Sequence, residues 1–455
     1  MKRWGEQTDL AIANFGVSGQ PMPAAIIHAL AHIKQHAAIV NATHGVLTTA
    51  VAEAIATAAI EVRRGDHADQ FPIDVFQTGS GTSTNMNVNE VIAHRAAEHL
   101  GSAVHANDHV NASQSSNDVF PTALRLCTIE GILHQLVPAL RHLSDALEPL
   151  ARQHASTVKA GRTHMMDAAP MTFGQEVNGW RRSIELGIER LNSTVPRLLE
   201  LPLGGTAVGT GLNAPSGFAS GVIARLSSDL DLPLVEASDH FEAQSAQEPL
   251  LESSGVVRLV ALSLHKIAGD LRLLSSGPLN GLGELELPEL QAGSSIMPGK
   301  VNPVIAEVVQ QVAAQVVGND AAVVFASATG SLLQLNTAMP VIGRNLLESL
   351  RLVTGAANSL TERCVGGIRV NVEVMSAYAE RSPAIAAALN PIIGYDAAKR
   401  VAQRAIRESR LVSQIALEEG LIEHSTLRYL DPLALATQGQ RRGSAAKLGD
   451  GNDIG

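Results

Sequence analysis

The chain has 455 residues, of which 45% are hydrophobic and 17% charged, and its formal net charge is −10 at neutral pH. This is the balance of a soluble globular protein, and the negative charge argues against binding to nucleic acid. Aromatic residues make up only 3%, so aliphatic side chains must fill the core, which favours packed helices over a β-sandwich.

The N-terminal segment MKRWGEQTDLAIANF gives no sign of export or membrane insertion. It lacks an uninterrupted apolar run of signal-peptide length, and no stretch of the chain reaches 18 consecutive apolar residues. We therefore expect a cytoplasmic protein that does not bind a membrane. The two cysteines, Cys127 and Cys364, lie in apolar stretches, and we expect both to be small core residues rather than disulfide partners.

Helical periodicity dominates the chain. Before residue 120 it is mixed, with helical patterns at 22–62 and 88–100. From Thr122 to Leu150 apolar residues recur every three or four positions, which is typical of helices that pack lengthwise. Pro138 and Pro149 should bend or end this helix locally.

The same periodicity returns in four later segments, so that five long helices are predicted to form a bundle in a mainly α-helical protein. These segments are 177–198, 257–274, 304–327 and 340–364. The third is apolar on most faces, which indicates burial by other subunits as well.

The predicted domain organisation follows these patterns. Residues 1–114 form a mixed, mainly helical N-terminal domain, and residues 115–370 form the long-helix bundle. Residues 371–436 form a small C-terminal helical domain. The polar, glycine-rich tail at 437–455 is expected to be disordered.

Polar residues gather in four segments outside the apolar seams. Taken singly, each reads as a cap or a turn. Taken together, they are four segments of mainly neutral, hydrogen-bonding residues, each at the end of a long helix. They are TGSGTSTNMN (78–87), HANDHVNASQSSND (105–118), AGRTHMMD (160–167) and QAGSSIMPGKVNP (291–303). The last belongs to a long connection, 276–303, and long ordered connections are usually functional.

These segments do not match the common metal or nucleotide motifs. The chain has no cysteine pair, no His-Glu-x-x-His and no repeated Asp-x-Asp loop. GSGTSTN lacks the Gly-Lys-Ser/Thr ending of a phosphate loop, and GGTAVGTG at 204–211 lies in no β-α-β context. We therefore expect no metal and no organic cofactor.

A pocket of uncharged donors with one lysine suits a small dicarboxylate. Hydroxyls, amides and helix N-termini can hold its carboxylates, while Lys300 stabilises negative charge that develops during reaction. His164 beside a carboxylate such as Glu307 could act as an acid and base. A serine in a glycine-flanked loop is a poor base unless amides and a cation stabilise its alkoxide.

The segment GSSIMPGKVNP is similar to the signature of the fumarase/aspartase superfamily. Five further segments resemble class II fumarases in the same order: QTGSGTSTNMNVNEVIAHRA, VHANDHVNASQSSNDVFPTA, AGRTHMMDAAPMTFGQE, LGGTAVGTGLN and NPIIGYDAAKRVA. The resemblance implies a fumarase/aspartase-like fold with a central five-helix bundle. It also implies a homotetramer with a twenty-helix core, in which three subunits contribute to each active site.

The resemblance further implies that the protein hydrates fumarate reversibly to (S)-malate in the tricarboxylic acid cycle without a metal or cofactor. Ser294 would be the base that removes the C3 proton of malate. His164, with Glu307 as its partner, would be the other acid/base. Lys300 and Asn302 would bind the carboxylate that becomes the aci-carboxylate. The implied substrate-binding residues are completed by Ser80, Gly81, Thr82, Ser115, Ser116, Asn117, Thr163 and Ser295, and a secondary anion site by His105, Ala106, Asn107 and Asp108.

Two alternatives compete with this reading. GRTH, SQSSN and MPGK are fumarase-like, whereas GTSTNMN and LLQLN resemble aspartases, and Gln334 stands where class II fumarases commonly carry Glu. Malate is therefore the expected substrate, with an aspartate ammonia-lyase as the enzymatic alternative. A structural tetramer without catalysis is disfavoured because all five implied reaction residues are present.

Overall fold

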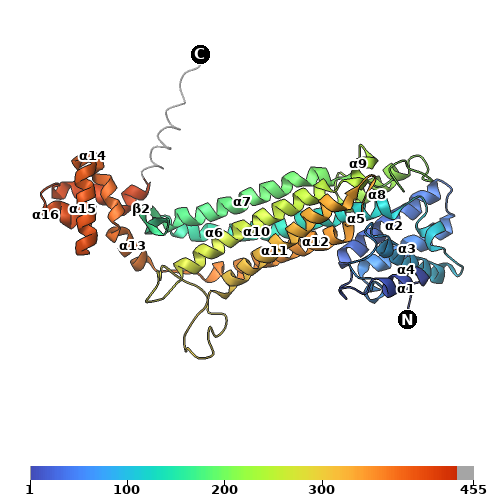
Figure 1. Cartoon of the computed structure of the whole chain (residues 1–455), viewed down its shortest axis with the longest axis horizontal. Coiled ribbons are helices and arrows are strands. Elements are labelled where there is room, and N and C mark those ends of the chain that lie inside the picture. The colour runs from blue at the N-terminus through green and yellow to red at the C-terminus, as the bar shows by residue number, and fades with distance from the viewer. Residues whose placement is uncertain (1, 438–455) are drawn as a thin grey trace, which may run out of the picture. The chain divides into compact units, whose positions relative to one another are not determined.

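The computed structural model describes residues 2–437, and it is mainly helical, as predicted (Figure 1). The chain divides into two compact units, each assembled from three separate stretches. The first unit comprises residues 1–139, 187–262 and 311–356, and the second comprises residues 140–186, 263–310 and 357–455. Residues 438–455, most of the tail predicted to be disordered, lie outside the described residues.

Five long helical segments correspond to the predicted seams, which confirms the helical bundle. They are the succession α5 (Ser116–Glu130), η3 (Gly131–Leu136) and α6 (Val137–Gln153), then α7 (Phe173–Leu198), α10 (Glu248–Leu274), α11 (Val304–Gly330) and α12 (Met339–Arg363). η3 is a widened π-helical turn that ends two residues before Pro138, where the missing N–H of proline leaves the regular helical ladder incomplete. Pro149 does not end its helix, since α6 continues to Gln153.

The first unit is built around α2, which is packed on nearly every side. This helix contacts α3, α4, α5 and α8, and Ile26, Leu30 and Ile33 on it are fully buried. Besides the long bundle helices, the elements of this unit are α1 (Glu6–Asn14), α2 (Ala24–Thr43), α3 (Thr49–Arg64), η1 (Ala68–Gln70), α4 (Thr82–Leu100), η2 (Ala106–Val110), β3 (Glu200–Leu201), α8 (Phe218–Leu230), β4 (Val235–Glu236), α9 (His240–Ser245), β6 (Ser331–Leu332) and β7 (Leu335–Asn336).

Helix α4 begins earlier than the sequence pattern predicted. Residues 82–87, expected to be a polar loop before a helix at 88, form its first turns. Their polar groups can be buried because they find partners: Thr84 Oγ1 donates to Gln77 Oε1 at 2.7 Å, and Asn87 Nδ2 donates to the Gln70 carbonyl at 3.0 Å.

Buried polar contacts hold α10, α11 and α12 together in the first unit. Ser254 Oγ on α10 donates to Asp320 Oδ1 on α11 at 2.7 Å, and Asn319 Nδ2 donates to Ser349 Oγ on α12 at 3.2 Å. Among the described residues α11 alone is long and apolar enough to span a membrane by length and composition. The buried Asp320, which also pairs with Arg258 at 2.8 Å, is the feature of a core helix in a soluble protein.

In the second unit the bundle helices carry a β-hairpin. Trp180 Nε1 on α7 donates to Asp270 Oδ2 on α10 at 2.8 Å, in agreement with the neighbouring ribbons of these helices in Figure 1. The hairpin consists of β1 (Val158–Thr163) and β2 (Met166–Thr172) in antiparallel register. A short antiparallel pair, β5 (Leu285–Glu286) with β8 (Arg369–Val370), joins the connection after α10 to the segment after α12.

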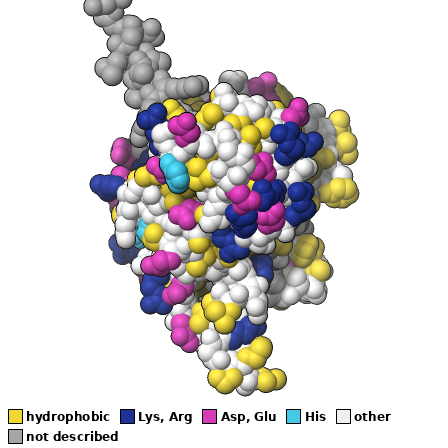
Figure 2. Space-filling view, turned by 90° about the vertical axis from the view of Figure 1, so that its left-hand side faces the viewer, with side chains coloured by type: hydrophobic (Ala, Val, Ile, Leu, Met, Phe, Trp, Pro, Cys, Tyr) yellow, Lys and Arg dark blue, Asp and Glu magenta, His cyan; other side chains and the backbone are white. Residues whose placement is uncertain are grey.

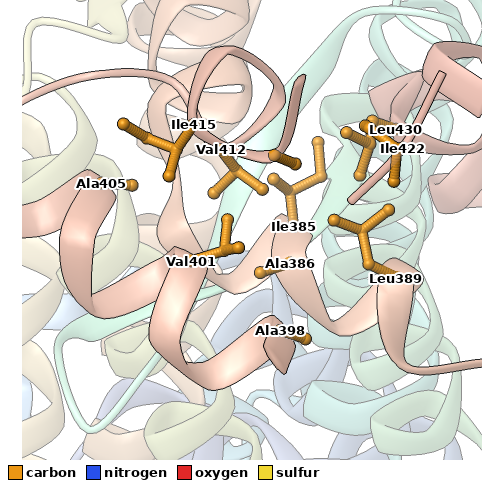
Figure 3. Close-up of a cluster of buried hydrophobic side chains, with 11 residues drawn as sticks. Ile385, Ala386, Leu389, Ala398, Val401, Ala405, Val412, Ile415, Ile422 and Leu430 are labelled. Carbon is orange, nitrogen blue, oxygen red and sulfur yellow. The ribbon is translucent and has the colours of Figure 1, made fainter. Parts of the chain in front are cut away.

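The C-terminal region of the second unit has an apolar core of its own. Figure 3 shows Ile385, Leu389, Val401 and Ile415 pointing toward one another from neighbouring short helices. The elements of this region are η4 (Val365–Gly367), α13 (Val372–Arg381), η5 (Pro383–Leu389), α14 (Asn390–Ile393), α15 (Tyr395–Glu408), α16 (Val412–Glu418) and η6 (His424–Leu430). The domain boundaries predicted after residues 114 and 370 stay predictions.

Charged side chains of both signs are interspersed on the face that this C-terminal region presents (Figure 2). Arg404 pairs with Glu408 and Glu419 at 2.7 and 3.0 Å and also with Glu418. Cys127 and Cys364 are both buried and free, as predicted. Burial raises the pKa of the Cys364 thiol to about 12, so this thiol is inert at neutral pH.

Candidate active site

In the first unit, two helix N-termini bring together a chain of three hydroxyl groups. Ser80 Oγ lies 2.7 Å from Thr82 Oγ1, and Thr82 Oγ1 lies 2.7 Å from Ser116 Oγ. Thr82 begins α4 and Ser116 begins α5. The N-terminus of a helix carries partial positive charge, so this arrangement suits a carboxylate. The N–H groups of Thr84 and Asn117 are already paired, with Gln77 Oε1 and Ser115 Oγ.

Gly81 makes the tight entry into α4 possible. Its φ is +74°, and a Cβ at this position would lie 2.2 Å from Cδ2 of Phe120. Only glycine fits both the left-handed backbone and the contact with the aromatic ring. The implied substrate residue Gly81 therefore has a conformational role: it sets Ser80 and Thr82 beside Ser116.

Asp118 ties the start of α5 to the glycine-rich connection at 201–217. Its buried carboxylate accepts hydrogen bonds from the N–H groups of Ser115, Gly204 and Thr206 at 2.9, 3.0 and 3.0 Å. Burial nevertheless raises the pKa of Asp118. Asn117 Nδ2 donates to the Ala207 carbonyl at 2.8 Å. The implied substrate residues Ser115, Ser116 and Asn117 thus lie at a helix N-terminus that hydrogen bonds fix to the connection at 201–217.

In the second unit, His164 lies at the tip of the β1–β2 hairpin. His164 and Met165 have φ values of +53° and +63°, as in the two-residue turns that match the twist of antiparallel strands. The preceding Thr163 pairs with Met166 across the hairpin. Within residues 2–437, His164 makes no hydrogen bond or ion pair, and its side chain is exposed. The predicted partnership with Glu307 does not occur within the described chain and stays a prediction.

Ser294 lies in a compact turn of the connection before α11. Its Oγ accepts hydrogen bonds from the N–H groups of Ile296 and Met297 at 3.1 and 3.0 Å. The two ends of this loop are joined as well, since Asn302 Nδ2 donates to the Gly293 carbonyl at 2.6 Å and Gly293 N–H donates to the Lys300 carbonyl at 3.0 Å. Two amides aimed at one hydroxyl oxygen stabilise negative charge on it.

A cavity of about 1130 Å³ lies beside this loop in the second unit. Its lining includes Lys300, Asn302 and Glu307, and two further cationic groups come from Arg272 and Arg369. Neither Ser294 nor His164 is part of the lining. One chain therefore holds the implied reaction groups in three places: the hydroxyl chain, the hairpin tip and the loop with its cavity.

Comparisons with known proteins identify the family of the chain. A lyase family matches residues 1–318, and a family described as the fumarase C C-terminus matches residues 385–437. The class II fumarate hydratase of Mycobacterium tuberculosis is 50% identical over 439 residues, covering 95% of this chain and 92% of that protein. The chain belongs to the class II fumarate hydratase family. The counterpart from Corynebacterium efficiens is 49% identical and covers 96% of this chain and 94% of its own.

Solved structures agree with this family. The class II fumarase of Schistosoma mansoni has a TM-score of 0.93 at 36% identity, and the match covers 96% of each chain. A fumarate lyase/delta crystallin from Brucella melitensis, crystallised with cobalt, has a TM-score of 0.92 at 43% identity and the same coverage. The predicted fold, the predicted family and the prediction of a hydro-lyase are confirmed.

The predicted secondary anion site of this fumarate hydratase family member is an exposed turn around η2. His105 Nδ1 accepts a hydrogen bond from the Asp108 N–H at 3.0 Å and lies 3.1 Å from Asp108 Oδ2. The two side chains are 58% and 78% exposed. The turn places His105, Ala106, Asn107 and Asp108 together, and their binding of an anion stays a prediction.

Lys34, a buried charged residue of the first unit, was not singled out by the sequence reasoning. It is completely buried on α2, and its Nζ donates to Asn111 Oδ1 at 2.8 Å. Burial lowers the pKa of Lys34 to about 7, against the opposing charge of Asp118. A single lysine inside the mainly apolar stretch AIIHALAHIKQHAAIV was the available signal.

The prediction of no metal site rested in part on the reading that the chain has no His-x-x-x-His spacing, and that reading is wrong for this stretch. His28, His32 and His36 follow one another at intervals of four residues, which places them on one face of a helix. Two of them meet a carboxylate from α8. Gln334, the residue at which this chain departs from the common fumarase pattern, lies in the exposed turn between β6 and β7.

Proposed function

We propose that the protein catalyses the reversible anti addition of water to fumarate, giving (S)-malate, as a step of the tricarboxylic acid cycle. The observation that carries this proposal is the near-full-length similarity, at about half of all positions, to proteins named as class II fumarate hydratases. The hydroxyl chain at two helix N-termini also supports the proposal, because hydroxyl groups and helix N-termini can hold the carboxylates of a small dicarboxylate.

In this proposal Ser294 removes the proton from C3 of malate. Its Oγ already accepts two backbone hydrogen bonds, from Ile296 and Met297, and an alkoxide at this atom would keep both of them. Lys300 and Asn302 stabilise the second negative charge that forms on the adjacent carboxylate as the aci-carboxylate develops. The remaining carboxylate of the substrate is held by the donors around Ser80, Thr82 and Ser116.

His164 gives a proton to the departing hydroxyl, which leaves C2 as water. Glu307 orients the imidazole and stabilises its protonated form. The electron pair of the broken C3–H bond forms the double bond of fumarate as the C2–O bond breaks. In the direction of hydration the same groups exchange roles. Thr163 and Ser295, next to the two reaction residues, complete the proposed substrate contacts.

We further propose that the protein is a homotetramer in which each active site takes residues from three subunits. The support is the exposure of large apolar side chains at the loop tips that carry reaction residues. Met165 and Met166 directly follow His164 and are 65% and 69% exposed, and Ile296, within the Ser294 loop, is 86% exposed. Apolar loop tips in a soluble protein are typical of surfaces that another subunit covers.

The cellular setting proposed is the cytoplasm, with a small dicarboxylate as substrate and with no nucleic acid or membrane as partner. The net charge of −10 supports the exclusion of nucleic acid. The expectation that no metal or organic cofactor takes part in the reaction rests on the reaction chemistry proposed here, in which protein side chains supply every proton and charge.

Ultraviolet absorbance of fumarate tests the proposal directly. Purified protein mixed with malate should produce fumarate rapidly, and protein mixed with aspartate should not. Ser294→Ala should lower kcat by roughly 10²–10⁴-fold, the usual contribution of a general base. Fumarate formed only from aspartate would replace the hydratase with an ammonia-lyase. Native-like turnover by Ser294→Ala would remove the serine from the mechanism.

A further inference from the structure

Helices α2 and α8 of the first unit bring two histidines and one aspartate to a single point. His32 and His36 lie one turn apart on α2, and Asp229 lies near the end of α8. The Nε2 atoms of His32 and His36 lie 3.2 and 2.9 Å from the same atom, Asp229 Oδ2. The histidine side chains are 6% and 5% exposed, whereas that of Asp229 is 42% exposed.

These separations fit a bound ion as well as they fit hydrogen bonds. Nitrogen and oxygen ligands bind zinc at about 2.1 Å, so two ligands of one ion lie about 3.0 Å apart at a right angle and about 3.4 Å apart at the tetrahedral angle. The three potential ligand atoms all lie within 4.8 Å of one another. Small side-chain rotations would therefore suffice to surround an ion, without movement of either helix.

Arg63 competes with a cation at this point. Its Nη1 lies 4.0 Å from Asp229 Oδ2 and donates to Gln35 Oε1 at 2.6 Å. Arg225 also acts electrostatically on His36. The second ring nitrogen of His36 is buried without a hydrogen-bond partner, whereas strong sites usually fix that nitrogen with an acceptor. Both features point to moderate rather than very tight binding.

We propose that His32, His36 and Asp229 bind one divalent transition-metal ion such as Zn²⁺, Co²⁺ or Ni²⁺. Two imidazoles and one carboxylate suit these ions better than Mg²⁺ or Ca²⁺, which prefer oxygen ligands. Water would fill the remaining positions on the exposed side of Asp229. The ion would cross-link α2 to α8 and stabilise the first unit. The site contains none of the proposed reaction residues, so it stands or falls separately from the proposed function.

The test uses the full chain after chelator treatment and dialysis. Titration with Co²⁺, followed by visible absorption, and with Zn²⁺, followed by calorimetry, should show one ion per chain with a Kd on the order of micromolar. Saturating Zn²⁺ should also raise Tm. Binding that needs millimolar ion, or that is absent, overturns the proposal.

Variants locate the ion. His36→Gln and Asp229→Asn should each weaken binding at least about tenfold, and circular dichroism checks that each variant is folded. Asp229→Asn changes a partly exposed side chain, so it serves if His36→Gln does not fold. His265→Gln, at an exposed histidine of α10, is the control and should bind as the native protein does. Equal affinity in native protein and Asp229→Asn, or equal loss in the control, overturns the site. Arg63→Met should tighten binding several-fold, since it removes the competing charge.

Discussion

Lys159 Nζ lies 3.1 Å from Glu284 Oε2, and the side chains of these two residues are 2% and 0% exposed. Arg162 Nη2 lies 2.7 Å from the other oxygen of Glu284. These are ion pairs by distance, although neither Glu284 oxygen has a well-directed hydrogen bond. Lys159 and Arg162 belong to β1, the strand that leads to His164, and Glu284 belongs to the connection that leads to Ser294. These ion pairs thus join two segments that carry proposed reaction residues, close to where each segment begins.

Glu284→Gln should lower the free energy of unfolding by about 3 kcal/mol, because it leaves the buried Lys159 and the partly buried Arg162 with one carboxylate fewer. Denaturant unfolding of the variant measures this loss. Glu286→Gln is the matched control two residues away, since its pair with Arg369 is exposed (57% for Glu286, 81% for Arg369) and exposed pairs contribute about 0–1 kcal/mol. If Glu284→Gln lost no more unfolding free energy than Glu286→Gln, the buried contact would contribute no more than an exposed one.

Gly81→Ala should damage both stability and turnover, whereas Gly101→Ala should affect stability only slightly. The two glycines cap the two ends of α4 at φ values of +74° and +71°, but a Cβ would clash with Phe120 only at Gly81 and would meet open space at Gly101. At Gly101 we expect backbone strain alone to lower the free energy of unfolding by about 1 kcal/mol. At Gly81 strain and overpacking together should lower it by about 3 kcal/mol.

Thermal unfolding and kcat/KM measured on the same two variants would distinguish these effects. The displaced Ser80 and Thr82 should reduce kcat/KM of Gly81→Ala at least about tenfold, because each lost or misplaced donor reduces the stabilisation of the bound carboxylates. If Gly101→Ala were equally inactive, the entry into α4 would not be what positions these hydroxyls.

Glu61 should contribute stability that disappears in acid. Hydrogen bonds from Arg95, and then from His67 and His99, hold the pKa of Glu61 at about 2, below its ordinary value of 4.5, against the opposing effect of burial. A carboxyl with a depressed pKa stabilises the folded state above its unfolded pKa, and this contribution is lost as the pH falls from about 4.5 toward about 2.

The difference in unfolding free energy between native protein and Glu61→Gln measures this contribution. Since water reaches 20% of the side chain, we expect about 1–2 kcal/mol at neutral pH and clearly less near pH 3. Glu98→Gln is the control, because Glu98 is a more exposed partner of the same Arg95. A difference for Glu61→Gln that does not change with pH would contradict the prediction.

Val324→Asp should break the proposed tetramer. Val324 is 45% exposed and its neighbour Phe325 is 70% exposed on α11, so a charge there would cost little in an isolated chain. In a tetramer it would bury an unpaired carboxylate at a subunit contact. Light scattering should give a smaller mass, and malate turnover should fall with it, since the proposed site needs three chains.

Lys399→Asp adds an acid at an exposed polar position of α15 and should leave the mass unchanged. A native protein that is monomeric and active would remove the shared site from the proposal. A tetrameric Val324→Asp would instead place the subunit contacts on other faces of the bundle.

The sequence by itself determined the long helices and the family, and it singled out the residues that we propose for the reaction. Apolar spacing alone marks α7, α10, α11 and α12, because a helix repeats its buried face locally every three or four residues. The motif around Ser294 can also be recognised in the sequence. Serines, glycines and a lysine contribute little to a helical core, so a chemical role is the simplest explanation for them.

Local reasoning failed where partners are distant in sequence. The polar start of α4 was expected to be a loop, but Thr84 and Asn87 are buried because Gln77 and the Gln70 carbonyl pair with them. Lys34 is buried through Asn111, which lies 77 residues away. A residue's own surroundings in the sequence do not reveal such pairings.

Only the tertiary structure decided which groups face each other. It placed Ser80 and Thr82 against Ser116, joined β1 to the Ser294 connection through Lys159 and Glu284, and set His32 against Asp229, 197 residues further along the chain. The helix spacing of His32 and His36 can be read from the sequence, but the carboxylate that meets them cannot. The physical reason is that helix periodicity is set by neighbours in the chain, whereas burial and charge pairing are set by how the helices pack.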